Sequence, residues 1–241
     1  MSAYCIAPNV IGNSSSYSLL YPQYELSSGN WNITPAPVPP SLSSFNAFQA
    51  QGAAGSATGA VGTVTYGCYL PNATEPSGTL TLSFSDPYSG DNSCSASTTT
   101  PHLSATASYP ITGQTCQFIW TVSTPITNGM IVQVTGSAAQ YLVLMGQTCL
   151  IPDPATESNL FTAAALANIL PINQWQFDAI PAGPPLTSGA SLGNVGPAIY
   201  LLTWGQACLI ASPPVFTEYG FNPANVNPIS TLPPLGMTIT S

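Results

Sequence analysis

The sequence predicts an all-β fold, an antiparallel β-sandwich or jelly roll built from internal repeats of about 60 residues with one or two short helices. Three observations lead to this prediction. Apolar residues occur in short segments, 25 prolines and 20 glycines interrupt the chain, and one motif recurs. Many short strands between turn residues are typical of a sandwich or barrel. A β-trefoil-like barrel is the alternative, because a third copy of the motif can be traced.

The recurring motif is YLVLMGQTCLIP at residues 141–152 and YLLTWGQACLI at residues 200–210. The likeness extends backwards to residues 125–129 (PITNG) and 185–189 (PLTSG), with an offset that stays between 59 and 61 residues. Residues 64–71 (VTYGCYLP) form the looser third copy. Repeats of this size usually correspond to supersecondary units that pack against one another.

The pattern divides the chain into four segments. Residues 1–40 are polar and dotted with proline, which predicts an extended N-terminal arm. Residues 41–108 are expected to form a first β unit with a hairpin insertion. Residues 109–169 make repeat unit A, and residues 170–241 make repeat unit B with the C-terminal tail.

In the first half of the chain, Ser41 as N-cap and Gly52 as terminator predict a short helix over residues 41–51. Residues 61–66 are expected to be a strand that leads into the third motif copy. Residues 79–85 (TLTLSFS) alternate perfectly, which indicates a strand with one buried and one solvated face. Residues 86–92 (DPYSGDN) supply its turn.

In the second half, continuous apolar runs at residues 118–122, 130–134 and 141–145 predict central strands covered on both faces. Asp153 as N-cap and Pro154 at the first helical position predict a helix that continues to about residue 170 and stops before Pro171. Residues 236–241 alternate again and predict a final strand.

The composition restricts the partners. The chain has no Lys or Arg, one His and eight carboxylates, where roughly 60 charged residues would be expected. Without cations it lacks the groups that bind nucleic acid or an anionic membrane surface. No apolar run is long enough for a spanning helix, and 44% apolar residues argue against disorder. In strong acid the carboxylates become neutral, so we expect an acid-stable protein without trypsin sites.

The cysteines predict an oxidising, extracellular setting. Six cysteines allow 15 pairings, no CxxC spacing occurs, and a single His cannot complete a zinc set. Disulfides are the first interpretation, and buried free thiols are the alternative. Three sequons are candidates for N-glycosylation if the chain is exported. These candidate residues are Cys5, Cys68, Cys94, Cys116, Cys149 and Cys208 for disulfides, and Asn13, Asn32 and Asn72 for glycans.

No catalytic set is evident, so we expect no enzyme and no cofactor. His102 is the one possible neutral-pH base, and no GxSxG motif accompanies it. The paired carboxylates Asp86/Asp91 and Asp153/Glu157 could in principle hydrolyse glycosides, but a turn and a helix N-terminus explain them structurally. Asp86 and Asp91 are weak candidates for calcium binding, because their spacing is not that of an EF-hand.

We therefore expect a structural subunit of a self-assembling extracellular filament, pilus, thread or coat. In composition the chain is similar to extracellular filament subunits of acid- and heat-loving archaea, which are poor in charge and rich in Ser, Thr and apolar residues. The expected partners are copies of itself, joined by a donated strand from residues 2–24 or 236–241 and by disulfides. One alternative is a carbohydrate-binding or adhesive module that stacks sugars on aromatic residues such as Trp31, Tyr88, Trp175 and Tyr219. The other is a virion surface (capsid) protein.

Overall fold

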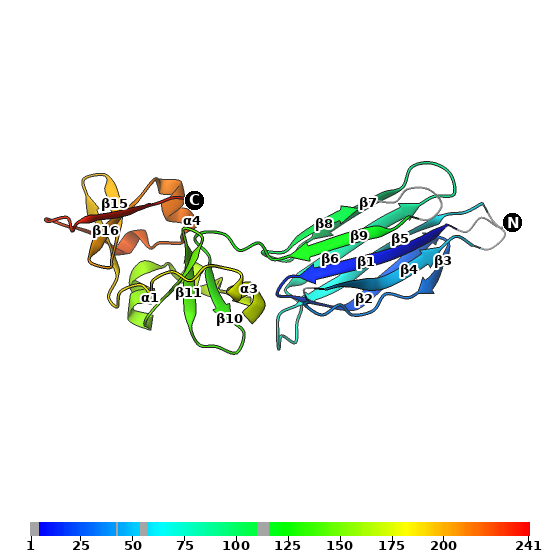
Figure 1. Cartoon of the computed structure of the whole chain (residues 1–241), viewed down its shortest axis with the longest axis horizontal. Coiled ribbons are helices and arrows are strands. Elements are labelled where there is room, and N and C mark those ends of the chain that lie inside the picture. Colours follow the sequence, from blue (N-terminus) through cyan, green and yellow to red (C-terminus); the bar gives the residue numbers. More distant parts are fainter. Residues whose placement is uncertain (1–4, 42, 54–56, 110–115) are drawn as a thin grey trace. The chain divides into compact units, whose positions relative to one another are not determined.

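The computed structural model describes residues 5–41, 43–53, 57–109 and 116–241. It confirms the all-β fold, with several antiparallel sheets and short helices. The chain forms two compact units, Met1–Pro125 (unit 1) and Ile126–Ser241 (unit 2), each with a core of its own (Figure 1). None of the helices in the described ranges is long and apolar enough to cross a membrane.

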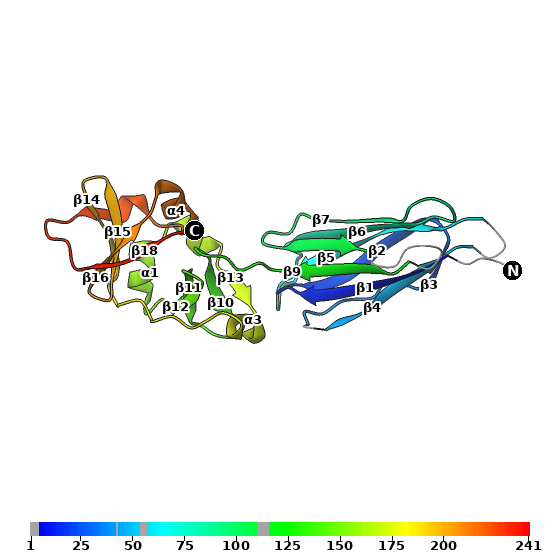
Figure 2. The same cartoon turned by 45° about the horizontal axis from the view of Figure 1, so that its top comes forward.

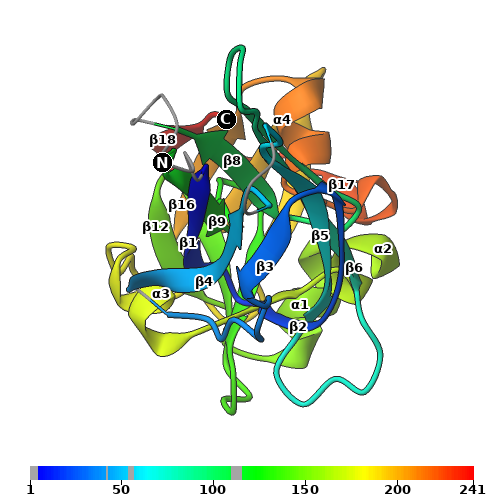
Figure 3. The same cartoon turned by 90° about the vertical axis from the view of Figure 1, so that its right-hand side faces the viewer.

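Unit 1 is a β-sandwich, and Figure 3 shows its two sheets end-on. One sheet has the order β3-β4-β1-β9-β8, and the other has the order β2-β5-β6-β7. Most neighbours are antiparallel, but β1 and β9 run parallel. The strands are β1 Ile6–Ser14, β2 Ser18–Ser28, β3 Asn30–Ile33, β4 Ser44–Gln51, β5 Ala60–Tyr69, β6 Gly78–Asp86, β7 Ser93–Thr98, β8 Ser104–Ser108 and β9 Phe118–Ser123.

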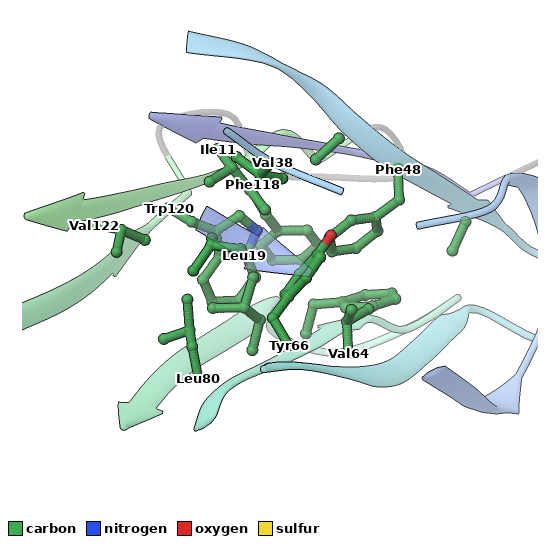
Figure 4. Close-up of a cluster of buried hydrophobic side chains, with 14 of the residues drawn as sticks. Ile11, Leu19, Val38, Phe48, Val64, Tyr66, Leu80, Phe118, Trp120 and Val122 are labelled. Atoms are coloured by element: carbon green, nitrogen blue, oxygen red, sulfur yellow. The ribbon is translucent and has the colours of Figure 1, made fainter. Parts of the chain in front are cut away.

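The side chains on the inward-facing side of each strand fill the space between the two sheets of unit 1. In β5 and β6 every second residue is buried, as the sequence of residues 79–85 predicts. Figure 4 shows Tyr66 of β5 and Trp120 of β9 pointing into the core, where both are fully buried. The Trp120 indole N–H donates to the Asn9 side-chain oxygen at 3.0 Å, so its polar group is satisfied in the core.

The expected N-terminal arm is part of the sandwich instead. β1 pairs with β4 on one side and with β9 on the other, and β2 pairs with β5. The inner face of β1 carries Asn9 and Asn13 beside Ala7 and Ile11, all fully buried. These two asparagines interrupt the alternation of apolar residues along β1. The sequence pattern therefore predicts an extended arm where the structure has a buried strand.

The helix expected over residues 41–51 is also wrong, because β4 occupies this segment. β4 lies between β1 and β3 and forms ladders with both. It buries Ala47, Phe48 and Ala50 against the core. Pairing on two sides outweighs the helix propensity of an Ala-containing segment with a good cap.

Unit 2 contains two small sheets, and Figure 2 labels all their strands except β17. The first sheet has the order β12-β11-β10-β13, and the second has the order β17-β14-β15-β16-β18. The strands are β10 Ile131–Val134, β11 Gln140–Leu144, β12 Gln147–Leu150, β13 Leu170–Ile172, β14 Ser191–Val195, β15 Ala198–Thr203, β16 Gln206–Ile210, β17 Val226–Pro228 and β18 Leu235–Ile239. The helices are α1 Pro154–Leu160, α2 Ala163–Ala167, α3 Gln174–Asp178, α4 Pro213–Glu218 and the 3-10 helix η1 Pro223–Asn225.

The sequence repeat corresponds to a β-hairpin in each sheet of unit 2. β11 and β12 are joined by Met145 and Gly146, and β15 and β16 by Trp204 and Gly205. All four turn residues have positive φ, between 51° and 76°. Two successive positive-φ residues make a type I′ turn, whose twist matches that of the strands. Residues 64–71, the looser third copy, instead run along β5 and leave it for the following turn, without such a hairpin.

The two repeats share one core and meet at equivalent residues. Phe161 and Phe221 form an antiparallel bridge and stack at 5.8 Å between ring centroids. Thr162 N–H donates to the Gly220 carbonyl at 2.9 Å, and Asn222 N–H donates to the Leu160 carbonyl at 2.8 Å. The extended Phe161 also splits the helix expected over residues 154–170 into α1 and α2.

The unit boundary lies at Pro125, whereas the sequence placed boundaries at residues 40, 108 and 169. β9 belongs to unit 1 because it pairs with β1 and β8, so repeat unit A begins after it. The described sheets form no closed barrel, which removes the β-trefoil-like alternative. More than the expected one or two helices are present, all of them short.

Candidate functional site

Two of the six candidate cysteines, Cys5 and Cys116, lie near Asp86 in unit 1, and Cys94 lies near Cys116. Burial raises the pKa of each thiol, to about 11 for Cys116, and the Asp86 carboxylate adds to the rise for Cys5 and Cys116. Cys5 precedes β1, and Cys116 lies two residues before β9, where its amide donates to the Ile6 carbonyl at 3.2 Å. Cys94 lies on β7 of the other sheet. All six cysteines are free thiols in the structure, so disulfide formation stays a prediction.

Asp86 is fully buried at the end of β6. Neither of its side-chain oxygens has a hydrogen-bond partner among the residues that the structure describes. Burial raises its pKa to about 6, and the nearby Cys116 amide, which donates to the Ile6 carbonyl, offsets only part of this rise. A buried carboxyl without partners favours its neutral form.

The weak calcium candidates do not form a site. Asp86 is buried, whereas Asp91 is exposed in the turn between β6 and β7. Within the described ranges no group of three or more His, Cys, Asp or Glu residues could hold a metal ion. His102 is exposed with a positive φ of 55° in the turn between β7 and β8, so it is a turn residue.

Asp153 has the structural role that the sequence predicts. Its side chain caps α1 by accepting from Thr156 N–H at 2.7 Å, and the Ser188 hydroxyl donates to it at 2.7 Å. These hydrogen bonds lower its pKa, the Thr156 amide first. Glu157 lies in the first turn of α1, where a carboxylate is favoured by the helix dipole.

The other cysteines are buried packing residues. A Cβ at Gly183 would lie 2.8 Å from the Cys149 sulfur, and one at Gly236 would lie 2.9 Å from the Cys208 sulfur. In each repeat the motif cysteine therefore packs against a glycine that lies two residues after a proline. Cys68 is fully buried on β5. The repeated cysteine is explained by this packing.

The glycosylation candidates differ in accessibility. Asn13 is fully buried, donates to the Tyr17 carbonyl at 2.8 Å and accepts from the Ser15 hydroxyl at 2.6 Å. It cannot carry a glycan in the folded chain. Asn32 and Asn72 are exposed, so they stay candidates.

The outer face of the β2-β5-β6-β7 sheet is lined with hydroxyl groups. The outward positions of β6 and β7 are all Ser or Thr, and the register continues them into β5, where Thr65 and Thr81 hydroxyls lie 3.1 Å apart. A groove of about 320 Å³ runs over this face. Its lining includes Glu25, Thr63, Ser83, Ser85, Ser93 and Ser95.

Unit 2 presents two apolar features on the second repeat. β18 is the edge strand of its sheet, parallel to β16 (Figure 2), and its Leu235 and Met237 are 68% and 42% exposed. A mostly apolar pocket of about 470 Å³ lies between the start of β15, the end of β16 and α4. Its lining includes Ile199, Leu209, Ile210, Phe216 and Val226, and none of its residues is charged.

Comparisons with known proteins give no family. No family model matches the chain, and no curated protein matches it. Among solved structures, the RahU protein in complex with a TRIS molecule is similar at 16% identity and a TM-score of 0.35, over 52% of this chain and 97% of RahU. The lipid binding protein Nakanori is similar at 12% identity and a TM-score of 0.40, over 49% of this chain and 71% of Nakanori. Likenesses this weak carry no argument about function.

Proposed function

We propose that the protein is a structural subunit that assembles with copies of itself outside the cell, in a filament, pilus, thread or coat. The observation that carries the proposal is the open edge at β18, which exposes Leu235 and Met237 and bears no charge. Monomeric proteins usually protect such edges with Lys, Pro or a covering element. Here Pro233 and Pro234 precede β18, but β18 itself, Leu235–Ile239, contains no Lys, no Pro and no acidic residue.

The strand pairing in unit 1 argues against residues 2–24, which the sequence predicts as a donated strand, as the linker. β1 is paired on both sides, and its turn into β2 is fixed by buried hydrogen bonds around Ser15 and Tyr17. Removing residues 1–24 would therefore unfold unit 1. The C-terminal strand remains as the candidate for contacts between copies.

The test is the mass of the full chain in solution. Size-exclusion chromatography with light scattering, over a concentration series at pH 4 and pH 7, is expected to show assemblies that grow with concentration. Negative-stain microscopy then distinguishes open filaments from closed coats. A monomer at every concentration and at both pH values would refute the proposal.

Glycan binding is the second candidate, and the hydroxyl-lined groove of unit 1 favours it. Hydroxyl groups together with Glu25 are suitable hydrogen-bond partners for a sugar. The aromatic residues considered for stacking do not converge there, since Tyr219 is buried and Trp31 packs on Phe48 and Phe84. A glycan array with the wild type and a Ser83→Ala/Ser95→Ala variant tests this candidate, because binding unaffected by the variant would exclude the groove.

A further inference from the structure

We infer that copies of the chain join head to tail through unit 2, with Leu235 and Met237 of one copy (the β18 knob) entering the apolar pocket of the next copy. The inference rests on the proposed function and names the two surfaces that self-assembly would use. Both surfaces belong to the second repeat, so they are placed relative to each other by the same sheet.

The β18 knob is exposed apolar surface at the edge of its sheet. Leu235 and Met237 project from the edge strand, whereas Ile239 at the other end of β18 is fully buried in the shared core. Exposed large apolar side chains that adjoin an open strand edge mark an interaction surface rather than ordinary scatter. Burying them in a neighbour removes apolar area from water.

The second repeat differs from the first at three positions that line the pocket. Ile199, Ser212 and Phe216 line it, and the residues 59 positions earlier are Gln140, Asp153 and Glu157. The first repeat folds with polar and acidic residues at these positions. Apolar side chains at two of these three positions, Ile199 and Phe216, are therefore found in the second repeat and not in the first, although Phe216 also packs on Phe221 in the shared core.

Leu235 of the knob and the pocket lie at opposite ends of β16, and Met237 lies between them, one residue before Thr238, which pairs with Leu209. The register pairs Leu235 with Ala207 at the start of β16. Leu209 and Ile210, which line the pocket, lie at its end, about 10 Å further along the strand. Two different surfaces on one unit make a heterologous contact, and such a contact forms an open filament unless its rotation closes a ring.

The charge of the two surfaces favours a second copy as the occupant. Neither the knob nor the pocket carries a charged residue, so two like-charged chains can meet there without placing a charge in the contact. An anionic lipid headgroup would find no cation near the pocket, because the chain contains no Lys or Arg. The chain itself supplies the complementary apolar side chains.

The experiment uses two full-length variants, Leu235→Asp to disable the knob and Ala211→Trp to fill the pocket. Ala211 is exposed at the pocket rim, so neither change enters the core. We expect each variant alone to self-associate at least about tenfold more weakly than the wild type. An equimolar mixture should form a 1:1 dimer, because one intact pocket and one intact knob remain. Tyr88→Asp, at an exposed apolar residue of unit 1, is the matched control and should assemble as the wild type does.

The outcomes separate this inference from the proposed function. A monomeric wild type refutes the proposed function and this inference with it. If the wild type assembles and each variant alone assembles equally well, the inference is refuted but the proposed function is not. The inference is also refuted if the equimolar mixture of the two variants forms no 1:1 dimer. It is likewise refuted if the pocket binds neutral phosphatidylcholine vesicles while the Leu235→Asp variant assembles like the wild type. Met237→Asp replaces Leu235→Asp if that variant fails to fold by circular dichroism.

Discussion

Asp86 makes a quantitative prediction about stability and pH. Its pKa is raised from 3.8 to about 6 by burial, so the folded state holds this proton more tightly than the unfolded state. The contribution of Asp86 to stability is therefore most favourable below about pH 4, falls as the pH rises from about 4 to 6, and is constant above that. The substitution Asp86→Asn keeps the shape of the neutral acid and removes the titration.

The magnitude follows from the shift. A shift of about 2 pH units at about 1.4 kcal/mol per unit amounts to about 3 kcal/mol, and solvent screening reduces the expected effect to about 2 kcal/mol. For a unit of this size that corresponds to a change in melting temperature on the order of 5–10 °C. We expect Asp86→Asn to melt higher than the wild type at pH 7 and at the same temperature at pH 3.

The assay is differential scanning calorimetry of the full chain between pH 3 and pH 8, with hydrogen exchange of the β6 amides to identify the transition of unit 1. Asp91→Asn, an exposed change in the same turn, is the matched control and should leave the pH profile unaltered. If the wild type and Asp86→Asn show the same pH profile, Asp86 is not a buried unpaired carboxyl and the reasoning fails.

Three further predictions concern single contacts. Asn9→Ala leaves the buried Trp120 N–H without its acceptor and should lower the free energy of unfolding by about 1–3 kcal/mol in urea titrations; a neutral effect would show that another acceptor reaches the indole. Gly236→Ala places a Cβ 2.9 Å from the Cys208 sulfur and should cost about 1–3 kcal/mol. Adding Cys208→Ala should recover part of that loss, and no recovery would contradict the packing role of the thiol. Asp153→Ala removes the α1 cap and should lower the melting temperature at pH 7. At a pH below the lowered pKa of the Asp153 carboxyl the substitution should have little effect, because the wild type has then already lost this charge. A loss of equal size in strong acid would rule out the charged cap.

The sequence predicted elements wherever apolar periodicity matched the secondary structure. Residues 79–85 alternate and form β6. Residues 118–122 form β9 as predicted, but β9 buries only Phe118, Trp120 and Val122 on one face and is not covered on both faces. The Asp153 cap was recognised because its residue types are specific for a helix start. In these places local pattern and tertiary environment favour the same structure.

The prediction failed where polar residues are buried or where pairing overrides propensity. β1 buries Asn9 and Asn13, whose side chains are satisfied by Trp120 and by the turn at Ser15. No pattern of apolar residues could reveal that strand. The type I′ turns also escaped notice, because Met145 and Trp204 are unusual at positive φ. The alternating apolar residues of the C-terminal tail are visible in the sequence. The pocket is not, because it forms only when β15, β16 and α4 come together in the fold.

Self-assembly should depend on pH and salt in a defined way. The chain carries a formal charge of −8 at pH 7, so copies repel one another over roughly 10 Å at 0.1 M salt. Protonation of carboxylates in acid reduces this repulsion, whereas the knob and pocket contain no side chain that changes charge. We therefore expect tighter assembly at pH 3.5 than at pH 7 at low salt, and a much smaller difference in 1 M NaCl. Light scattering at each combination of pH and salt concentration measures the extent of assembly. Weaker assembly in acid would mean that ionised carboxylates take part in the contact, and the apolar head-to-tail contact would then have to be abandoned.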